Sequence, residues 1–592
     1  MLKSLPLRLA VLAAIAATPA LADTKLVKSG DRFQLTVDNK PFPVKGIGGL
    51  TNLDLAAASG ANTLRTWGTD ELDTLLDQAQ KAGLKVTVGI WLGHERHGFN
   101  YNDVEQVAAQ YDKARAAIEK YKSHPAILMW AIGNEMEGFK DGDNAAIWSA
   151  VNNIAALAKR LDPSRPTMTV VAEVGGARVS SIHKLCPDVD IIGINSYAGA
   201  ASLPKRYAAA GGTKPYIVTE FGPPGTWEVE KTSYGSLIEP TSTQKADSYR
   251  TSALALSADP LCLGHYAFKW GNKQEATATW FGMLLPDNSR LGAVDVMQEI
   301  WSGKPAANRA PLIQPISLAA SDRSKPGTTH TATVSATDPD NDKLTYTWEL
   351  HRESDEVKLG GDAEPATLNF PDAILKSDAG AVEFKLPAIP GAYRLFAFVR
   401  DGKGNAATAS STLLAEAPTP PPVAGTIPAK LPLVVYADDV VPNWHPSGWM
   451  GNHGAIKVDP AHTVKPHSGL VSFKVDYLAP DGFAGIAWQY PPNDWGDLPA
   501  SFNANGAKKL SLWARGEVGG EKVEFKFGIL DKSKKFPDSA SGGVAVTLTP
   551  EWKQYFIDVE GLDLSNIKTG FVWSVAGQGK PLTFYLDDIK FE

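Results

Sequence analysis

The sequence of 592 residues predicts a multidomain protein: a (β/α)8 TIM barrel followed by an immunoglobulin-like β-sandwich and a β jelly roll. Three observations predict this class. Short β-rich runs alternate with helical patterns between about residues 25 and 305, which is typical of parallel βα units. After Lys304 the helical periodicity stops and alternating strand patterns continue to the end. The chain is also longer than one hydrophobic core normally supports.

The first residues have the pattern of a secretory signal peptide. Lys3 and Arg8 supply the positive end, residues 9–17 form the apolar run, and residues 20–22, Ala-Leu-Ala, resemble a cleavage site. The run is much shorter than the about 20 apolar residues of a membrane anchor. We therefore expect a signal peptide over 1–22, cleavage after Ala22, a secreted or periplasmic protein, and no membrane contact afterwards.

The composition is that of a globular chain, with 43% hydrophobic residues, 21% charged residues and a net charge of -7. This acidic balance gives no basis for expecting a nucleic-acid partner. The cysteines Cys186 and Cys262 are too few for a disulfide scaffold, and one disulfide or two buried thiols remain open. The sequence does not indicate an oligomeric state.

The barrel is predicted over residues 23–305, where eight β-rich runs each end in Gly, polar or aromatic residues. The runs are 42–49, 62–68, 85–92, 126–135, 166–173, 189–197, 216–222 and 265–271. A helix is predicted over 70–82, with Thr69 as its N-cap and Gly83 as its stop, and another over 102–122. Residues 25–40 alternate like a hairpin, which we expect at the bottom of the barrel.

Two β-rich modules are predicted after the barrel. Residues 310–416 resemble the polycystic-kidney-disease type of immunoglobulin-like module through the run ATDPDNDKLTYTW at 336–348, and we expect a spacer there. Residues 417–432 contain six prolines, a composition that predicts a semi-rigid linker. Residues 433–592 end in FYLDDIKF, which resembles the last strand of jelly-roll carbohydrate-binding modules.

Two carboxylates stand at the ends of predicted barrel strands, where active sites of this fold lie. The fourth strand ends in Asn134-Glu135, and the seventh ends in Glu220-Phe221-Gly222. Hydrolysis of a glycosidic bond with retention needs one carboxyl that protonates the leaving oxygen and another that attacks the anomeric carbon, about 5 to 5.5 Å apart. Strands four and seven face each other across a barrel mouth, so the sequence predicts such a pair.

At five strand ends the sequence resembles clan A, a superfamily of retaining glycoside hydrolases. Asn134-Glu135 and Glu220 match the acid/base and nucleophile positions of that clan, and further matches are Arg65, Tyr197 and Trp270. The resemblance covers residues 30–305 and is closest to families 2 and 5. It differs from family 2 in that only a hairpin precedes the barrel, which puts a family 2 exoglycosidase activity in doubt.

The resemblance implies a role for each matched residue. Glu135 would be the general acid/base and Glu220 the nucleophile, without cofactor or catalytic metal. Arg65 and Tyr197 would keep Glu220 ionised, while Asn134 would bind the sugar 2-hydroxyl. Trp270 would form the floor of the sugar site, although an aromatic residue of this kind also suits core packing.

Four further residues are predicted to contact substrate, each with a structural alternative. His94 is expected to bind a sugar hydroxyl or to lie at the rim, and its spacing to His97 is one residue short of the helical zinc-protease motif. Glu173 is a substrate-binding or a structural residue. Trp227 and Trp280 lie in long loops, where they stack on sugar rings or pin the loop to the barrel.

The last module offers candidate ligands of two kinds. Its tryptophans suit a glycan-binding platform, although a jelly roll also buries several in its core. Asp587 and Asp588 offer oxygens to a structural Ca²⁺, but paired acids on a terminal strand are more often a solvated edge.

We therefore expect a secreted retaining O-glycoside hydrolase that cleaves β-bonds of a polysaccharide, with β-glucan favoured. A β-glucan transglycosylase would use the same residues and differ only in the acceptor. A non-catalytic glycan-binding surface protein is the alternative from another class. The sequence leaves open the linkage, endo or exo action, and the ligand of the last module.

Overall fold

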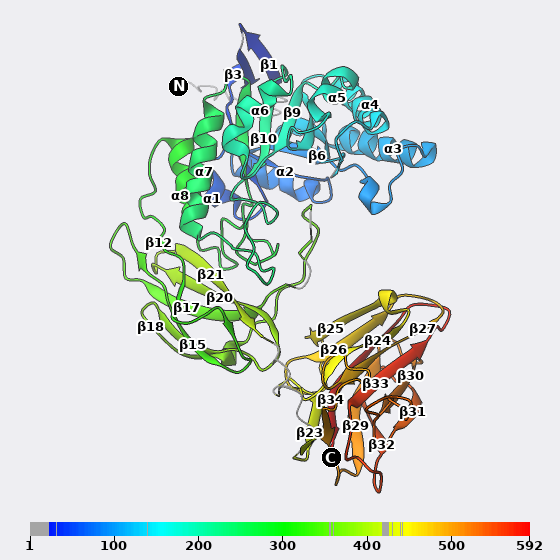
Figure 1. The fold of residues 1–592 in the computed structure, drawn as a ribbon. Coiled ribbons are helices and arrows are strands. Elements are labelled where there is room, and N and C mark those ends of the chain that lie inside the picture. Colours follow the sequence, from blue (N-terminus) through cyan, green and yellow to red (C-terminus); the bar gives the residue numbers. More distant parts are fainter. Residues whose placement is uncertain are drawn as a thin grey trace, which may run out of the picture.

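The computed structural model describes residues 23–592 apart from 31, 139, 355–356, 359, 417–425, 429, 439 and 441. The predicted signal peptide and most of the predicted linker therefore lie outside the described residues. A barrel surrounded by helices is followed along the chain by two β-sandwiches (Figure 1). The predicted class, a multidomain chain with a (β/α)8 barrel ahead of β-sandwich domains, is confirmed.

Eight parallel strands close the barrel in the order β10-β11-β4-β5-β6-β7-β8-β9. They are β4 Val44–Gly48, β5 Thr63–Arg65, β6 Lys85–Ile90, β7 Ile127–Asn134, β8 Thr167–Ala172, β9 Ile191–Asn195, β10 Tyr216–Phe221 and β11 Cys262–Phe268. All residues of β9 and β10 are buried, because side chains fill the inside of the barrel and helices cover its outside. This burial on both faces explains why the strands appear as apolar runs in the sequence.

The helices between the strands cover the barrel (Figure 1). They are α1 Leu53–Ala58, α2 Leu72–Lys81, α3 Val104–Tyr121, α4 Ala145–Leu161, α5 Arg178–Leu185, α6 Leu203–Ala209, α7 Ser242–Ser257 and α8 Gly292–Ser302, with short 3-10 turns η1 Glu95–His97 and η2 Ala200–Ser202. The predicted cap of α2 is wrong. Its N-cap is Glu71 rather than Thr69, and the Glu71 side chain makes no capping hydrogen bond.

One predicted strand is displaced along the sequence. β11 begins at Cys262 and ends at Phe268, whereas the sequence predicted residues 265–271. After the strand, the Lys269 N–H donates to the Phe281 carbonyl at 3.0 Å, and the Trp270 N–H donates to the carbonyl of Gly48, the last residue of β4, at 2.9 Å. Trp270 therefore lies beyond the strand end. Gly264 lies inside the strand with a φ of 129°, a backbone conformation that glycine adopts readily.

A three-stranded antiparallel sheet precedes the barrel and consists of β1 Thr24–Ser29, β2 Arg32–Val37 and β3 Lys40–Pro41. Leu35 and Val37 of this sheet pack with Met129 and Tyr266 of the barrel interior. The sheet lies at the opposite end of the barrel from the first sandwich (Figure 1). It therefore covers the end of the barrel away from the strand ends that carry Glu135 and Glu220.

The first sandwich packs two four-stranded sheets, β13-β15-β19-β18 and β14-β21-β20-β17. Its strands are β12 Leu312–Ile313, β13 Ser317–Leu318, β14 Arg323–Ser324, β15 Thr329–Thr333, β16 Ala336–Thr337, β17 Thr345–Arg352, β18 Ile374–Asp378, β19 Ala381–Lys385, β20 Gly391–Arg400 and β21 Ala406–Ala415, with a 3-10 turn η3 at Pro371–Ala373. Inward residues of both sheets, among them Leu350, Phe384 and Leu395, form its core.

The second sandwich packs β25-β26-β34-β29-β32, with β23 on β34, against β24-β27-β33-β30-β31. Its strands are β22 Thr426–Pro428, β23 Leu433–Tyr436, β24 His445–Gly451, β25 Ile456–His462, β26 Ser472–Tyr477, β27 Phe483–Gln489, β28 Ser501–Asn503, β29 Lys509–Gly516, β30 Lys522–Phe527, β31 Gly542–Thr547, β32 Lys553–Asp558, β33 Thr569–Ala576 and β34 Leu582–Phe591, with a 3-10 turn η4 at His453–Ala455. Trp444, Trp488 and Trp573 are fully buried, so they are core residues rather than a binding platform.

The two cysteines are free thiols, and Cys186 is buried. Burial raises the pKa of each thiol to about 12, so both are inert at neutral pH. Within the described residues, every helix is too short or too polar to cross a membrane.

Candidate active site

A cavity of about 280 Å³ lies at the carboxyl ends of the barrel strands. Four of its residues lie at the ends of β7, β10 and β11: Asn134, Glu135, Glu220 and Phe268. Loops after the strands add the remaining barrel residues, Trp67, Trp91, Tyr197, Trp227, Lys269, Lys273 and Glu275, and the first sandwich adds Gly360 and Gly361. The two predicted carboxylates thus share one cavity.

Glu220 accepts three hydrogen bonds, two from buried side chains and one from the half-buried Trp67. Trp67 Nε1 donates to Oε1 at 2.8 Å, and the Tyr197 hydroxyl donates to Oε2 at 2.7 Å. The Arg65 guanidinium, only 1% exposed, lies 3.2 Å from Oε1. Three donors that hold the carboxylate in one position suit a nucleophile.

Glu135 has the opposite environment. Burial raises its pKa to about 7, and the nearby charge of Glu220 acts in the same direction. Its carboxyl accepts a hydrogen bond from Asn195 Nδ2 at 2.6 Å. A carboxyl with a pKa near 7 can both donate and accept a proton at neutral pH, which a general acid/base requires.

Arg65 links these groups behind the cavity. Its Nη2 donates to Oδ1 of the Asn134 side chain at 2.8 Å, and its Nη1 donates to the Thr219 main-chain carbonyl at 2.9 Å. Oδ1 of the Asn195 side chain accepts from the Thr219 hydroxyl at 2.7 Å. This network fixes Asn134 and Asn195 beside the two glutamates.

Sequence reasoning did not select Trp67 and Asn195 as site residues. Both had a usable signal. Trp67 lies two residues after Arg65, so it projects to the same side of an extended chain. Asn195 is the last residue of β9, where polar side chains reach the mouth of a barrel.

Two predicted substrate contacts are wrong because the residues are fully buried. Trp270 lies beyond β11 and donates from Nε1 to the Thr51 carbonyl at 2.7 Å, while Phe268 lines the cavity instead. Trp280 donates to the Pro224 carbonyl at 3.0 Å and has no exposed face for a sugar. Trp227 does line the cavity, with 51% of its surface exposed.

His94 and Glu173 also lie outside the cavity lining. His94 is buried and stacks on Trp91 with 4.8 Å between ring centroids, and burial lowers its pKa to about 4. Trp91, 48% exposed, lines the cavity in its place. Glu173 pairs with Arg206 and accepts a hydrogen bond from the Ser196 hydroxyl. These contacts favour the structural alternative for both residues.

Two lysines bring positive charge to the cavity. Lys273 pairs with Glu275, which also lines the cavity. The Lys269 ammonium lies 5.1 Å from the centroid of the Trp67 ring and makes no ion pair with any described residue. Burial lowers the pKa of Lys269, and the charge of Lys273 lowers it further. Lys269 is therefore a partly desolvated cation in the same cavity as Glu220.

In the described part of the chain, the group of acids close enough to share a metal ion is Asp338, Asp342 and Asp401 of the first sandwich. Asp342 already pairs with Lys403, and Asp401 accepts the Lys403 and Asn405 main-chain N–H groups. Asp587 accepts main-chain N–H groups from His467 and Ser468. A structural Ca²⁺ at Asp587 and Asp588 stays a prediction.

Residues 71–254 match the glycosyl hydrolases family 2, TIM barrel domain. This range contains Asn134, Glu135, Tyr197 and Glu220. The predicted resemblance to clan A glycoside hydrolases is therefore confirmed for this part of the barrel, while the resemblances of the two later modules stay predictions.

A curated β-glucuronidase from Paenibacillus borealis is 27% identical over 239 residues, 35% of this chain and 38% of that protein. A solved β-D-glucuronidase of Dictyoglomus thermophilum is 19% identical with a TM-score of 0.37, covering 48% of this chain and 54% of that one. A Ruminococcus gnavus β-glucuronidase is 17% identical with a TM-score of 0.38, covering 48% and 53%. The chain thus spans well under two thirds of the length of these proteins.

Proposed function

We propose that the chain is a retaining β-glycoside hydrolase that works by double displacement, with Glu220 as nucleophile and Glu135 as general acid/base. The observation that supports this most strongly is the contrast between the two carboxyls in one cavity. Glu220 accepts three hydrogen bonds, whereas the pKa of Glu135 is raised to about 7. Environments that separate two carboxyls in this way assign acid and base roles.

In the first step, a carboxylate oxygen of Glu220 attacks the anomeric carbon while Glu135 gives its proton to the leaving glycosidic oxygen. The bond to the leaving sugar breaks, and a glycosyl ester of Glu220 forms. In the second step, the Glu135 carboxylate takes a proton from water as the water oxygen attacks the anomeric carbon. The ester bond breaks, so both glutamates return to their starting states.

The neighbouring residues support this chemistry. Trp67, Tyr197 and Arg65 hold Glu220 in place and stabilise its negative charge. Oδ1 of the Asn134 side chain accepts a hydrogen bond from Arg65. The side-chain NH2 group of Asn134 therefore remains to bind the sugar 2-hydroxyl. The exposed faces of Trp91 and Trp227 suit stacking on sugar rings.

We take a β-linked polysaccharide as the substrate, with β-glucan as the first candidate. A β-glucuronide is the second candidate. Lys269 has no carboxylate partner among the described residues and lies in the cavity, where it suits a sugar carboxylate. The curated relative from Paenibacillus borealis carries the name β-glucuronidase, which supports testing this sugar. Export through the N-terminal leader is part of the same proposal.

The test is release of reducing sugar from β-glucans, mannan, xylan and galactan, together with aryl β-glucosides and aryl β-glucuronides. Wild type is compared with Glu220→Ala, with and without azide. We expect activity on one sugar class, its loss in Glu220→Ala, and rescue by azide to an α-glycosyl azide. Glu230→Ala, an exposed acid in the loop after β10, is the matched control and should keep full activity.

Two other outcomes would contradict the proposal. Products longer than the starting oligosaccharide at high substrate, in place of hydrolysis, would indicate the transglycosylase. Binding to a glycan without turnover of any substrate would indicate a non-catalytic binding protein.

A further inference from the structure

The first sandwich contributes main chain to the candidate active site. Gly360 and Gly361 line the cavity, although they belong to the segment between β17 and β18. We call residues 360–364 the wall segment. The sequence pattern of residues 310–416 predicted a module that acts as a spacer, and this contact contradicts that prediction.

Charged side chains attach the wall segment to two barrel loops. Arg96 Nη1 lies 2.9 Å from Asp362 Oδ2, and the Lys273 ammonium donates to the Gly361 carbonyl at 3.3 Å. Glu364 accepts the Ala276 main-chain N–H at 2.7 Å. Arg96 belongs to η1 after β6, whereas Lys273 and Ala276 follow β11. The segment therefore reaches two separate parts of the barrel rim.

The strand order shows which side of the mouth is covered. In the closed barrel, β4 and β5 lie between β11 and β6. A segment fixed to the loops after β11 and β6 therefore closes the mouth on the side of β4 and β5. Trp67, which follows β5, and Gly360 line the same cavity, in agreement with this placement.

The two glycines allow the main chain to approach these cations closely. Both have left-handed φ values, 75° and 76°. A Cβ atom on Gly360 would lie 2.9 Å from Arg96 Nη2, and one on Gly361 would lie 3.3 Å from the Lys273 ammonium. Residues with side chains would therefore be strained in this backbone conformation, and the ends of Arg96 and Lys273 would have to move to make room for them.

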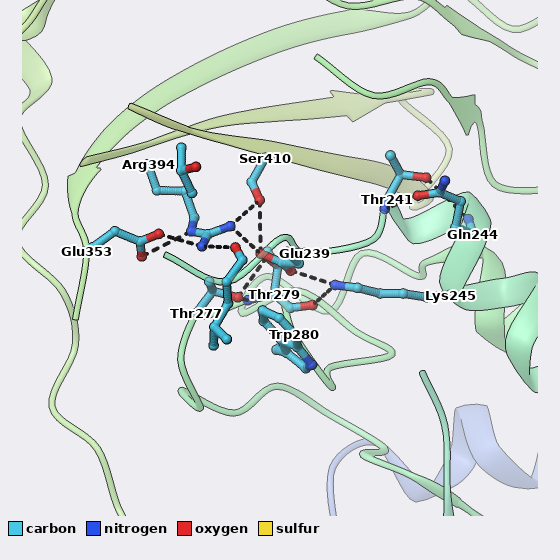
Figure 2. A network of polar contacts seen from close by, with 12 residues as sticks. Glu239, Thr241, Gln244, Lys245, Thr277, Thr279, Trp280, Glu353, Arg394 and Ser410 are labelled. Carbon is cyan, nitrogen blue, oxygen red and sulfur yellow. Dashed lines mark hydrogen bonds and ion pairs between the residues drawn. The ribbon is translucent and has the colours of Figure 1, made fainter. Parts of the chain in front are cut away.

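A buried ionic network fixes the sandwich against the barrel (Figure 2). The Arg394 guanidinium of β20 donates to the Leu237 carbonyl at 2.7 Å and pairs with Glu353 just after β17. Glu239 of the barrel accepts from the Lys245 ammonium at 2.6 Å and from the Ser410 hydroxyl at 3.0 Å. Charges buried in this way hold their partners in one geometry. Glu353 precedes the wall segment in the sequence. The network therefore fixes the chain at a point just before that segment.

We propose that the wall segment is part of the substrate-binding site and limits the cavity to the terminal sugar of a glycan. This rests on the proposed glycosidase function and assigns its specificity. A volume of about 280 Å³ lies below the 300–1,000 Å³ of ordinary ligand pockets, so the cavity suits one sugar better than an extended chain. The first sandwich is then a working part of the catalytic unit, and cleavage proceeds from chain ends.

The test measures kcat and KM on an aryl β-glycoside of the preferred sugar, and the products from oligosaccharides of increasing length. Asp362→Ala releases one anchor of the wall segment. We expect the KM of this variant to rise about fivefold, which is the largest effect expected from the loss of one exposed ion pair. Its kcat should stay within about twofold of the wild-type value. We also expect internal cleavage products that the wild type does not form.

Two further variants separate this role from a general weakening of the interface. The charge swap Arg96→Asp with Asp362→Arg restores the ion pair and should return KM and the product pattern toward wild type. Asp287→Ala removes another ion pair between barrel and sandwich, with Arg400, whose residues do not line the cavity. It should leave KM and the products unchanged.

Unchanged KM and products in Asp362→Ala, with an active wild type and an inactive Glu220→Ala, would overturn the wall proposal and leave the glycosidase proposal intact. The same changes in Asp287→Ala would also overturn it. An inactive wild type on every substrate would defeat both proposals.

Discussion

The indole nitrogen of Trp67 donates a hydrogen bond to Oε1 of Glu220 at 2.8 Å. Arg65 contacts the same oxygen from a buried position. Glu220 is therefore held by groups of β5 and the residues just after it, across the barrel from β10. The nucleophile proposed for this chain depends on contacts that its own strand does not supply.

Trp67→Phe should lower kcat/KM by roughly tenfold to hundredfold, because a hydrogen bond to a charged group contributes about 1.5 to 3 kcal/mol. The measurement is steady-state kinetics on the aryl glycoside that the wild type prefers. Trp91→Phe is the matched control, since Trp91 lines the cavity without a hydrogen bond to Glu220. An equal loss in both variants would show that the indole N–H has no special role.

Glu135 should give the enzyme an alkaline limb near pH 7. Its pKa is raised to about 7, and a general acid must carry its proton, so kcat/KM should fall as the pH rises through this value. In Glu135→Gln this limb should disappear, while a substrate with a good leaving group should still form the glycosyl-enzyme. A limb that persists in Glu135→Gln would assign the acid to another group.

The same shift affects stability. Because the folded-state pKa of Glu135 lies above its ordinary value of 4.5, the folded protein binds more protons between the two values. The wild type therefore loses stability as the pH rises from about 4.5 to about 7, and Glu135→Gln does not. In thermal unfolding, the melting temperature of Glu135→Gln should rise relative to that of the wild type as the pH increases across this range. A difference in melting temperature that stays constant would contradict the raised pKa of Glu135.

Phe268 and Trp280 should respond differently to substitution. Phe268→Ala removes a side chain that lines the cavity and should raise KM by roughly tenfold. Trp280→Phe should leave KM unchanged but lower the free energy of unfolding by about 2 kcal/mol, because a buried ring and its bond to Pro224 are altered. The reverse pattern would restore Trp280 as a substrate contact.

Lys269→Met separates the two candidate substrates. If Lys269 binds a sugar carboxylate, kcat/KM for an aryl β-glucuronide should fall by roughly tenfold or more, since a charge-assisted hydrogen bond is lost. The value for an aryl β-glucoside should change little. Equal effects on both substrates would argue against carboxylate recognition.

The fold and the central pair were predictable because local patterns encode them. Strands buried on both faces appear as apolar runs, and Glu135 and Glu220 stand where such runs end in polar residues. The role of Trp270 was mispredicted because β11 ends at Phe268, and two residues later the indole is buried against the Thr51 carbonyl instead of facing the cavity.

The wall segment was beyond sequence reasoning for a different reason. Arg96 and Asp362 are 266 positions apart and belong to different modules. Their contact depends on how the first sandwich docks on the barrel, and no periodicity or motif reports docking. The network of Arg394 and Glu239 depends on the same docking.

The most direct test of the proposed mechanism is to trap the glycosyl-enzyme. The protein is incubated with a 2-deoxy-2-fluoro aryl β-glycoside of its preferred sugar, digested, and mapped by mass spectrometry. The account predicts one added fluorosugar on the peptide that contains Glu220, and none when Glu220→Ala is treated in the same way. A label on another residue, or turnover of the natural substrate with no label and inverted product, would contradict it.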